Sequence, residues 1–109
     1  AARKQAIEEA TRAATRVPLS VLQRCRQAVD LAAVVAKSGN KNSLSDAAVA
    51  AATVRTAAEG AFLNVCINLP GITDETFKNN VLQQARETKE AVVAQSQVLL
   101  QEIEQQLHG

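Results

Sequence analysis

The sequence contains few of the residues that build turns and strands. Its 109 residues include 4 Gly, 2 Pro and 2 Phe, with no Trp and no Tyr. A β-sandwich or β-barrel needs many turns and strands rich in β-branched and aromatic residues, so both are excluded. Alanine, leucine, glutamine and glutamate are abundant instead, and they favour helices. The composition predicts an all-α protein, and the length predicts one domain over residues 1–109.

No part of the chain carries charge of predominantly one sign. Its 12 Lys and Arg residues nearly balance 11 Asp and Glu residues, for a net charge of +1. Without a basic run, binding to nucleic acid or to an anionic membrane is not expected. The longest apolar stretch, 47–69, contains Arg55 and Glu59, so we expect no membrane span. No signal peptide is recognised, and we expect a cytoplasmic protein.

Cysteine and histidine are scarce. Cys25 and Cys66 lie far apart, and the single histidine, His108, is next to the C-terminus. A zinc site needs more such residues at ligand spacing, so no metal site is predicted. We interpret both cysteines as small apolar core residues. The sequence also lacks a Gly-rich phosphate loop and any Ser-His-Asp or Cys-His set.

Helical spacing divides the chain into about four segments of an up-and-down bundle. The first covers residues 1–15. Pro18 then removes a backbone hydrogen bond, so we expect a kink or a tight break there. The second segment runs from Pro18 to about Lys37 and ends at Gly39, because glycine readily adopts the left-handed conformation past a helix. Its predicted buried face is Leu22, Cys25, Val29, Ala32 and Ala36.

The third segment is expected to run from Ser43 to about Asn68, before Pro70. Ser43 would be its N-cap, with Asp46 three residues later in an arrangement similar to a capping box. Because the segment carries little charge, it should be the central helix of the bundle.

The fourth segment, from the expected N-cap Thr73 to the C-terminus, is the long helix of the bundle. Its narrow apolar stripe resembles that of a coiled coil and extends over roughly 50 Å, which is longer than the third segment can cover. We therefore expect the end of the stripe to face water in a monomer and to be covered in a dimer. The residues of that end are Leu99, Leu100, Ile103 and Leu107.

Small and polar residues share one side of the third segment. At about 100° per residue, one stripe is formed by Asp46, Ala50, Thr53, Ala57, Gly60, Asn64 and Asn68. In one interpretation the small residues admit a neighbouring helix, while the polar ones cap the helix or bond to nearby backbone. In the other, the stripe is the floor of a groove for a flat ligand. The residues alone leave both open.

Three pieces of sequence occur in order within residues 17–77: VPL, then GNKNSLSDAAVAA, then EGAFLNVCINLPGITDETF. In combination they resemble the C-terminal, cyclodeaminase domain of the formiminotransferase-cyclodeaminase family. The resemblance implies a homodimeric helical domain that acts on folates without a metal or redox cofactor. The implied reaction closes 5-formiminotetrahydrofolate to 5,10-methenyltetrahydrofolate and releases ammonia. Members of the family can instead hydrolyse the methenyl bridge.

The resemblance also implies roles for residues. Asn40, Ser45, Asn64 and Asn68 are expected to bind the folate substrate. The implied chemistry needs a proton for the departing nitrogen, and Asp46, the only acid on the stripe of small and polar residues, is our candidate to supply or relay it. Family domains are longer and carry a Gly-rich segment and an acidic residue in an N-terminal half. We therefore expect this chain to be the C-terminal part, with that half or a second copy as partner. A non-catalytic dimerisation module is the alternative.

Overall fold

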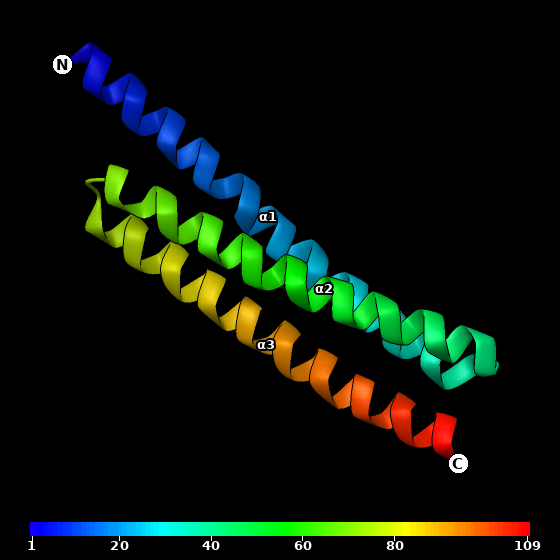
Figure 1. Ribbon diagram of the computed structural model, residues 1–109. Helices are drawn as coiled ribbons and strands as arrows, with labels where there is room; N and C mark the ends of the chain where they lie inside the picture. Colours follow the sequence, from blue (N-terminus) through cyan, green and yellow to red (C-terminus); the bar gives the residue numbers. More distant parts are fainter.

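The computed structural model describes residues 1–109 as a rod of three antiparallel helices, 64 × 17 × 16 Å (Figure 1). They are α1 (Ala2–Ser38), α2 (Lys41–Asn68) and α3 (Glu75–His108), with a 3-10 turn η1 (Leu69–Gly71) after α2. The all-α class and the up-and-down order are confirmed. The prediction of about four segments is wrong by one, because the first two segments form a single helix.

That single helix, α1, continues through Pro18 without a break. Proline in a helix costs about 3 kcal/mol, since it removes one N–H and crowds the preceding turn. Here the ring is buried, and so are Thr15 one turn before it and Leu22 one turn after it. Packing on both sides of Pro18 therefore keeps the helix continuous.

Gly39 and Asn40 join α1 to α2. Gly39 ends α1 as predicted, but its backbone is extended, with φ −87° and ψ 167°, and not left-handed. A Cβ atom there would lie 2.7 Å from the Val35 carbonyl oxygen and 2.6 Å from Ser43 Cβ, so the close approach requires glycine. The N-cap of α2 is Asn40 and not Ser43. Its side chain accepts a hydrogen bond of 3.0 Å from the Ser43 N–H.

The α2–α3 turn is tied to the beginning of α1. Asp74, and not Thr73, is the N-cap of α3, and its side chain accepts a hydrogen bond of 3.1 Å from the Phe77 N–H. Thr73 instead donates its N–H and its hydroxyl to the Glu8 carboxylate, at 2.8 and 2.7 Å. The Arg12 guanidinium lies 3.2 Å from Asp74. These contacts fix the N-terminal turns of α1 against the turn between the other helices.

The core consists of two buried clusters along the rod. The larger one lies around Leu22, Phe62 and Ile72, and the smaller one is rich in alanine. The predicted buried face of the second segment, Leu22 to Ala36, is confirmed.

The prediction that the end of the fourth segment faces water in a monomer is wrong for its main residues. Leu99 and Ile103 are only 5% and 1% exposed, because they pack in one cluster with Ala32 and Ala36 of α1 and with Leu44, Ala47 and Ala51 of α2. Leu100 is half-buried, and Leu107 remains exposed.

Candidate functional site

The stripe of small and polar residues from Asp46 to Asn68, called here the α2 stripe, lies on the surface of the chain. Ala50, Thr53, Ala57, Gly60 and Asn64 are exposed, and Asn68 is half-buried. A Cβ atom added at Gly60 would meet no other atom within 4 Å. No helix of the same chain covers the stripe, so packing within the chain does not account for its small residues.

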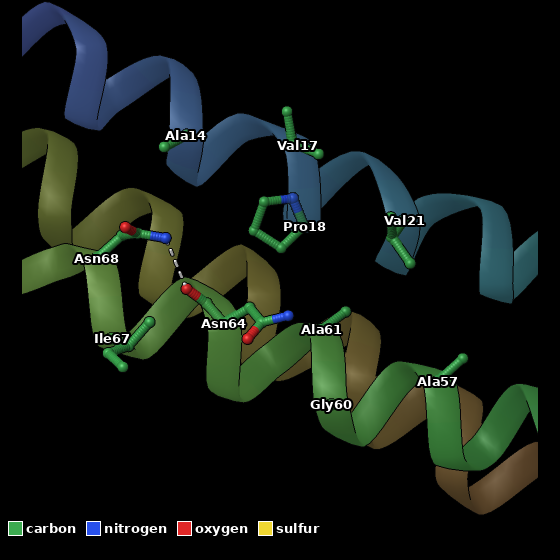
Figure 2. A pocket seen from close by; sticks show the side chains of 10 residues that line it. All are labelled: Ala14, Val17, Pro18, Val21, Ala57, Gly60, Ala61, Asn64, Ile67 and Asn68. Atoms are coloured by element: carbon green, nitrogen blue, oxygen red, sulfur yellow. Dashed lines mark hydrogen bonds between the residues drawn. The ribbon is translucent and has the colours of Figure 1, made fainter.

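A groove of about 460 Å³ runs between α1 and one half of the α2 stripe (Figure 2). The ring of Pro18 points across it from α1 toward α2. No residue of α3 lines this groove. Its apolar wall comes from α1, and its floor comes from α2. The residues are Ala14, Val17, Pro18 and Val21 on the wall, and Ala57, Gly60, Ala61, Asn64, Ile67 and Asn68 on the floor.

Amide groups supply the polarity of this groove. The Asn68 side-chain N–H donates to the Asn64 backbone carbonyl at 2.9 Å, which leaves the Asn68 side-chain oxygen as a free acceptor. The Asn64 side-chain amide makes no hydrogen bond within the chain, so its donors and its acceptor are all available. Pro18 has no N–H for the Ala14 carbonyl. The groove thus offers an apolar surface edged with amide donors and acceptors, which suits a flat ligand with polar edges.

The other three predicted site residues lie at the opposite end of α2. Asn40 caps the helix, and Ser45 donates its hydroxyl to the Asn42 carbonyl at 3.1 Å. Asp46 is exposed and does not cap the helix. The side chain of Asp46 borders a second hollow, of about 310 Å³.

The structure therefore separates the predicted residues into two groups. Asp46 and Asn64 lie about 27 Å apart along α2, at a rise of about 1.5 Å per residue. Within one chain these two side chains cannot contact the same end of a ligand.

The contribution of α1 to the groove was missed by the sequence reasoning, apart from the motif that contains Pro18. The available signal was a second stripe at steps of three and four residues on the exposed side of α1. Its members, called here the α1 stripe, are Val17, Val21, Arg24, Ala28, Leu31 and Val35.

Other reactive groups form no second site. Burial raises the pKa of the Cys25 thiol, which makes it a weak nucleophile. Cys66 is partly buried against the larger core cluster, in line with the predicted core role. No three His, Cys, Asp or Glu side chains come together in a way that could hold a metal ion. None of the helices has a stretch long and apolar enough to cross a membrane.

Comparison with known proteins relates the chain to folate enzymes. The sequence profile described as formiminotransferase-cyclodeaminase matches residues 1–87. A methenyltetrahydrofolate cyclohydrolase of Methylorubrum extorquens is 42% identical over 84 residues, which are 77% of this chain and 40% of that protein. The formimidoyltransferase-cyclodeaminase of Rattus norvegicus is 37% identical over 95 residues, 81% of this chain and 17% of that protein. The Sus scrofa protein of the same name is 32% identical over 102 residues, 94% of this chain and 19% of that protein. The chain thus spans two fifths or less of each relative.

Proposed function

The chain belongs to the formiminotransferase-cyclodeaminase family, and from this membership we propose that it forms one wall of the folate site of a formiminotetrahydrofolate cyclodeaminase. The observation that carries the proposal is the groove at Asn64. Asn64 belongs to the sequence motif that resembles the family and lines the open apolar groove. Its side-chain amide makes no hydrogen bond within the chain. A folate has a flat ring edged with amide and amine groups, which such a groove suits.

The proposed reaction joins N10 of the folate to the formimino carbon and expels the former formimino nitrogen as ammonia. The departing nitrogen must gain protons, and a positioned acid would supply or relay one. Asp46 keeps this predicted role as a proposal, provided that a second chain brings it to the groove. Asn40 and Ser45 lie near Asp46 and would bind the substrate at that end. The proposal needs no metal and no redox cofactor, because the substrate carries the reacting group.

Hydrolysis of the 5,10-methenyl bridge is the second candidate. The observation that favours it is the 42% identity to the Methylorubrum extorquens cyclohydrolase. Both reactions take place at the same bridging carbon, so one folate groove would serve either of them. Release of ammonia from 5-formiminotetrahydrofolate would support the first candidate, whereas opening of 5,10-methenyltetrahydrofolate alone would support the second. A groove that binds no folate would favour the non-catalytic dimerisation module.

Calorimetric titration with 5-formiminotetrahydrofolate tests the groove. Asn64→Ala removes the free amide and should weaken binding about tenfold, as expected for lost hydrogen bonds of about 1.4 kcal/mol. Asn80→Ala is the matched control, because Asn80 is an exposed asparagine on α3, away from the groove. Equal binding by the two variants would overturn the assignment.

Asp46→Asn tests the proton role separately. The variant keeps the shape of the side chain, so the fold should persist while cyclisation slows at least tenfold. Cyclisation by the variant at the parental rate would remove Asp46 from the chemistry. We also propose a cytoplasmic location, and a working unit completed by a second copy or by the part of the relatives that this chain does not span.

A further inference from the structure

A smaller hollow, of about 250 Å³, adjoins the groove and is formed by α1 alone. It is lined by Val17, Ser20, Val21 and Arg24, and is called here the α1 hollow. Val17 and Val21 also line the groove, so the groove and the α1 hollow meet along these two valines. No charged residue lines the groove, and Arg24 is the only one in the α1 hollow. Together they form one apolar surface with a single positive charge.

The side chain of Arg24 has no partner within the chain. Arg24 is exposed and takes part in none of the ion pairs, all of which involve other cations. It also lies over neither phenylalanine ring, whereas four other basic side chains do. All five N–H donors of its guanidinium are therefore available, in a planar arrangement that matches a carboxylate.

Ser20 offers a second donor in the α1 hollow. Other helical hydroxyl groups donate to the backbone carbonyl four residues earlier, as those of Thr11, Thr15 and Ser38 do in α1. The Ser20 hydroxyl makes no hydrogen bond within the chain, and the residue is exposed. Residues four apart on a helix are neighbours on its surface. The hydroxyl of Ser20 and the guanidinium of Arg24 can therefore donate to the same carboxylate.

The amide groups of the groove lie away from Arg24. Figure 2 shows Asn68 and Ala14 at one end of the groove and Val21 at the other, with Asn64 between them. Arg24 follows Val21 by one turn and lies about 15 Å from Ala14 along α1. One end of this surface thus offers neutral donors and acceptors, and the other offers a cation. A ligand that fits both is elongated, with a polar ring edge at one end and an anion at the other.

We propose that Ser20 and Arg24 bind a carboxylate of the folate's glutamate and so fix the direction in which the substrate lies. This inference rests on the proposed function. A folate is elongated, with a flat ring that carries amide and amine groups at one end and a glutamate at the other. When the ring edge lies at Asn64 and Asn68, the benzoyl group crosses the apolar valines and the glutamate reaches Arg24. In the reverse direction the glutamate would lie beside neutral amides, and Arg24 would stay without a partner.

In this arrangement Arg24 determines specificity and takes no part in the reaction at the bridging carbon. It distinguishes a folate from a compound that has the same ring but no negative charge at the far end. Because the contact is open to solvent, its contribution to binding is modest and is weakened by salt.

Calorimetric titration with two matched ligands tests this contact. Tetrahydrofolate is compared with its diamide, in which neutral carboxamides of nearly the same size replace both glutamate carboxylates. The parent chain should bind tetrahydrofolate about fivefold more tightly at low salt, as expected for an exposed charge-assisted contact. Arg24→Gln should bind both ligands equally, with the diamide bound as tightly as by the parent chain. Arg26→Gln is the matched control and should keep the preference, because Arg26 is exposed and lines neither the groove nor the α1 hollow.

A preference for tetrahydrofolate that survives in Arg24→Gln would overturn the inference, and so would equal weakening of both ligands by that variant. The proposed function is judged separately by Asn64→Ala, which should weaken both ligands to the same extent. If both ligands bind with this dependence on Asn64 but the parent chain does not distinguish them, the folate groove stands and the role of Arg24 is rejected. Absence of binding of either ligand would overturn both.

Backbone amide shifts test the direction of the bound ligand. The complexes with tetrahydrofolate and with its diamide should differ most at Ser20 and Arg24, and little at Asn64 and Asn68. Differences concentrated at Asn68 would show that the ligand lies in the reverse direction, which would contradict the inference.

Discussion

The helices α2 and α3 have similar lengths but differ in their exposed sides. Outside its buried stripe, α3 presents mainly glutamine and glutamate to solvent. The exposed side of α2 presents mainly alanine, valine, threonine and asparagine, and Asp46, Arg55 and Glu59 are its only charged residues after Lys41. The surface of α3 is thus a normal solvent surface, whereas that of α2 is typical of a helix covered on all sides. The exposed side of α2, unlike that of α3, therefore has the composition of a surface that a ligand or another molecule covers.

Truncation of an apolar side chain should destabilise the chain strongly at a buried position of α3 and hardly at all at an exposed position of α2. Ile103 on α3 is 1% exposed, so Ile103→Ala should lower the free energy of unfolding by about 2–5 kcal/mol. Leu63 on α2 is 65% exposed, so Leu63→Ala should change it by less than about 0.5 kcal/mol. Urea denaturation at a concentration where the chain is monomeric measures both. Similar losses would mean that the exposed side of α2 contributes to the fold of the single chain.

Replacement of Pro18 tests whether this proline, which lines the groove between α1 and α2, lowers the stability of the fold. Pro18→Ala restores one backbone hydrogen bond and relieves the preceding turn, worth about 3 kcal/mol, but it loses part of the buried ring. We expect a net gain of about 1–2 kcal/mol in thermal or chemical unfolding, together with weaker folate binding in the groove. A loss of stability would show that packing of the ring outweighs the missing hydrogen bond.

Ser96, a buried residue of α3, offers a comparable substitution outside the groove. Its hydroxyl is fully buried and has no hydrogen-bond partner, and an unsatisfied buried polar group costs about 1–3 kcal/mol. Ser96→Ala should therefore raise the free energy of unfolding by about 1 kcal/mol and leave folate binding unchanged. Destabilisation by this substitution would contradict the assignment of the hydroxyl as unsatisfied.

The smallest expected effect concerns pH at the end of the rod where α1 meets the α2–α3 turn. Hydrogen bonds from the Thr73 side chain and backbone lower the pKa of Glu8 below its ordinary value of 4.5. The hydrogen bond from the Phe77 N–H, and then Arg12, lower the pKa of Asp74 below 3.8. Since both pKa values are lowered on folding, the stabilisation is complete above these ordinary values and is lost as the pH falls below them.

Amide exchange at Thr73 measures this effect. Exchange should accelerate below about pH 4 in excess of the change at other turn amides, because the protonated Glu8 carboxyl is a weaker acceptor. In Glu8→Gln the protection at Thr73 should be low at every pH. Unchanged protection in that variant would show that Glu8 does not hold the turn.

The sequence indicated the helices well and their ends less well. Gly39 and Pro70 marked real boundaries, because glycine and proline restrict the backbone locally. The caps were misplaced by one to three residues at Ser43 and Thr73, because neighbouring Asn40 and Asp74 are equally good caps. Only the packing against Glu8, far away in sequence, engages Thr73 and leaves Asp74 to cap α3.

The sequence did not show which apolar or polar stripes are buried within the chain, because the spacing of residues on one helix does not reveal which segment packs against them. The apolar stripe of α3 was expected to need a second chain as cover, while for the α2 stripe a neighbouring helix and a ligand groove were both left open. The structure covers Leu99 and Ile103 within the same chain, with Ala32 and Ala36 of α1 and with Leu44, Ala47 and Ala51 of α2. The groove likewise depends on packing between helices. Asn64 was correctly placed on a polar stripe, but its neighbours Val17 and Pro18 come from a helix that the sequence divided in two.

The most direct test of folate binding in the groove between α1 and α2 uses the backbone amide shifts of the labelled chain. They are recorded during titration with 5-formiminotetrahydrofolate. The account predicts saturable shifts concentrated at Val17, Gly60 and Asn64, with no comparable change at Asn80 or Val98 on the exposed side of α3. Shifts confined to α3, or none at saturating folate in a chain that remains helical, would contradict it.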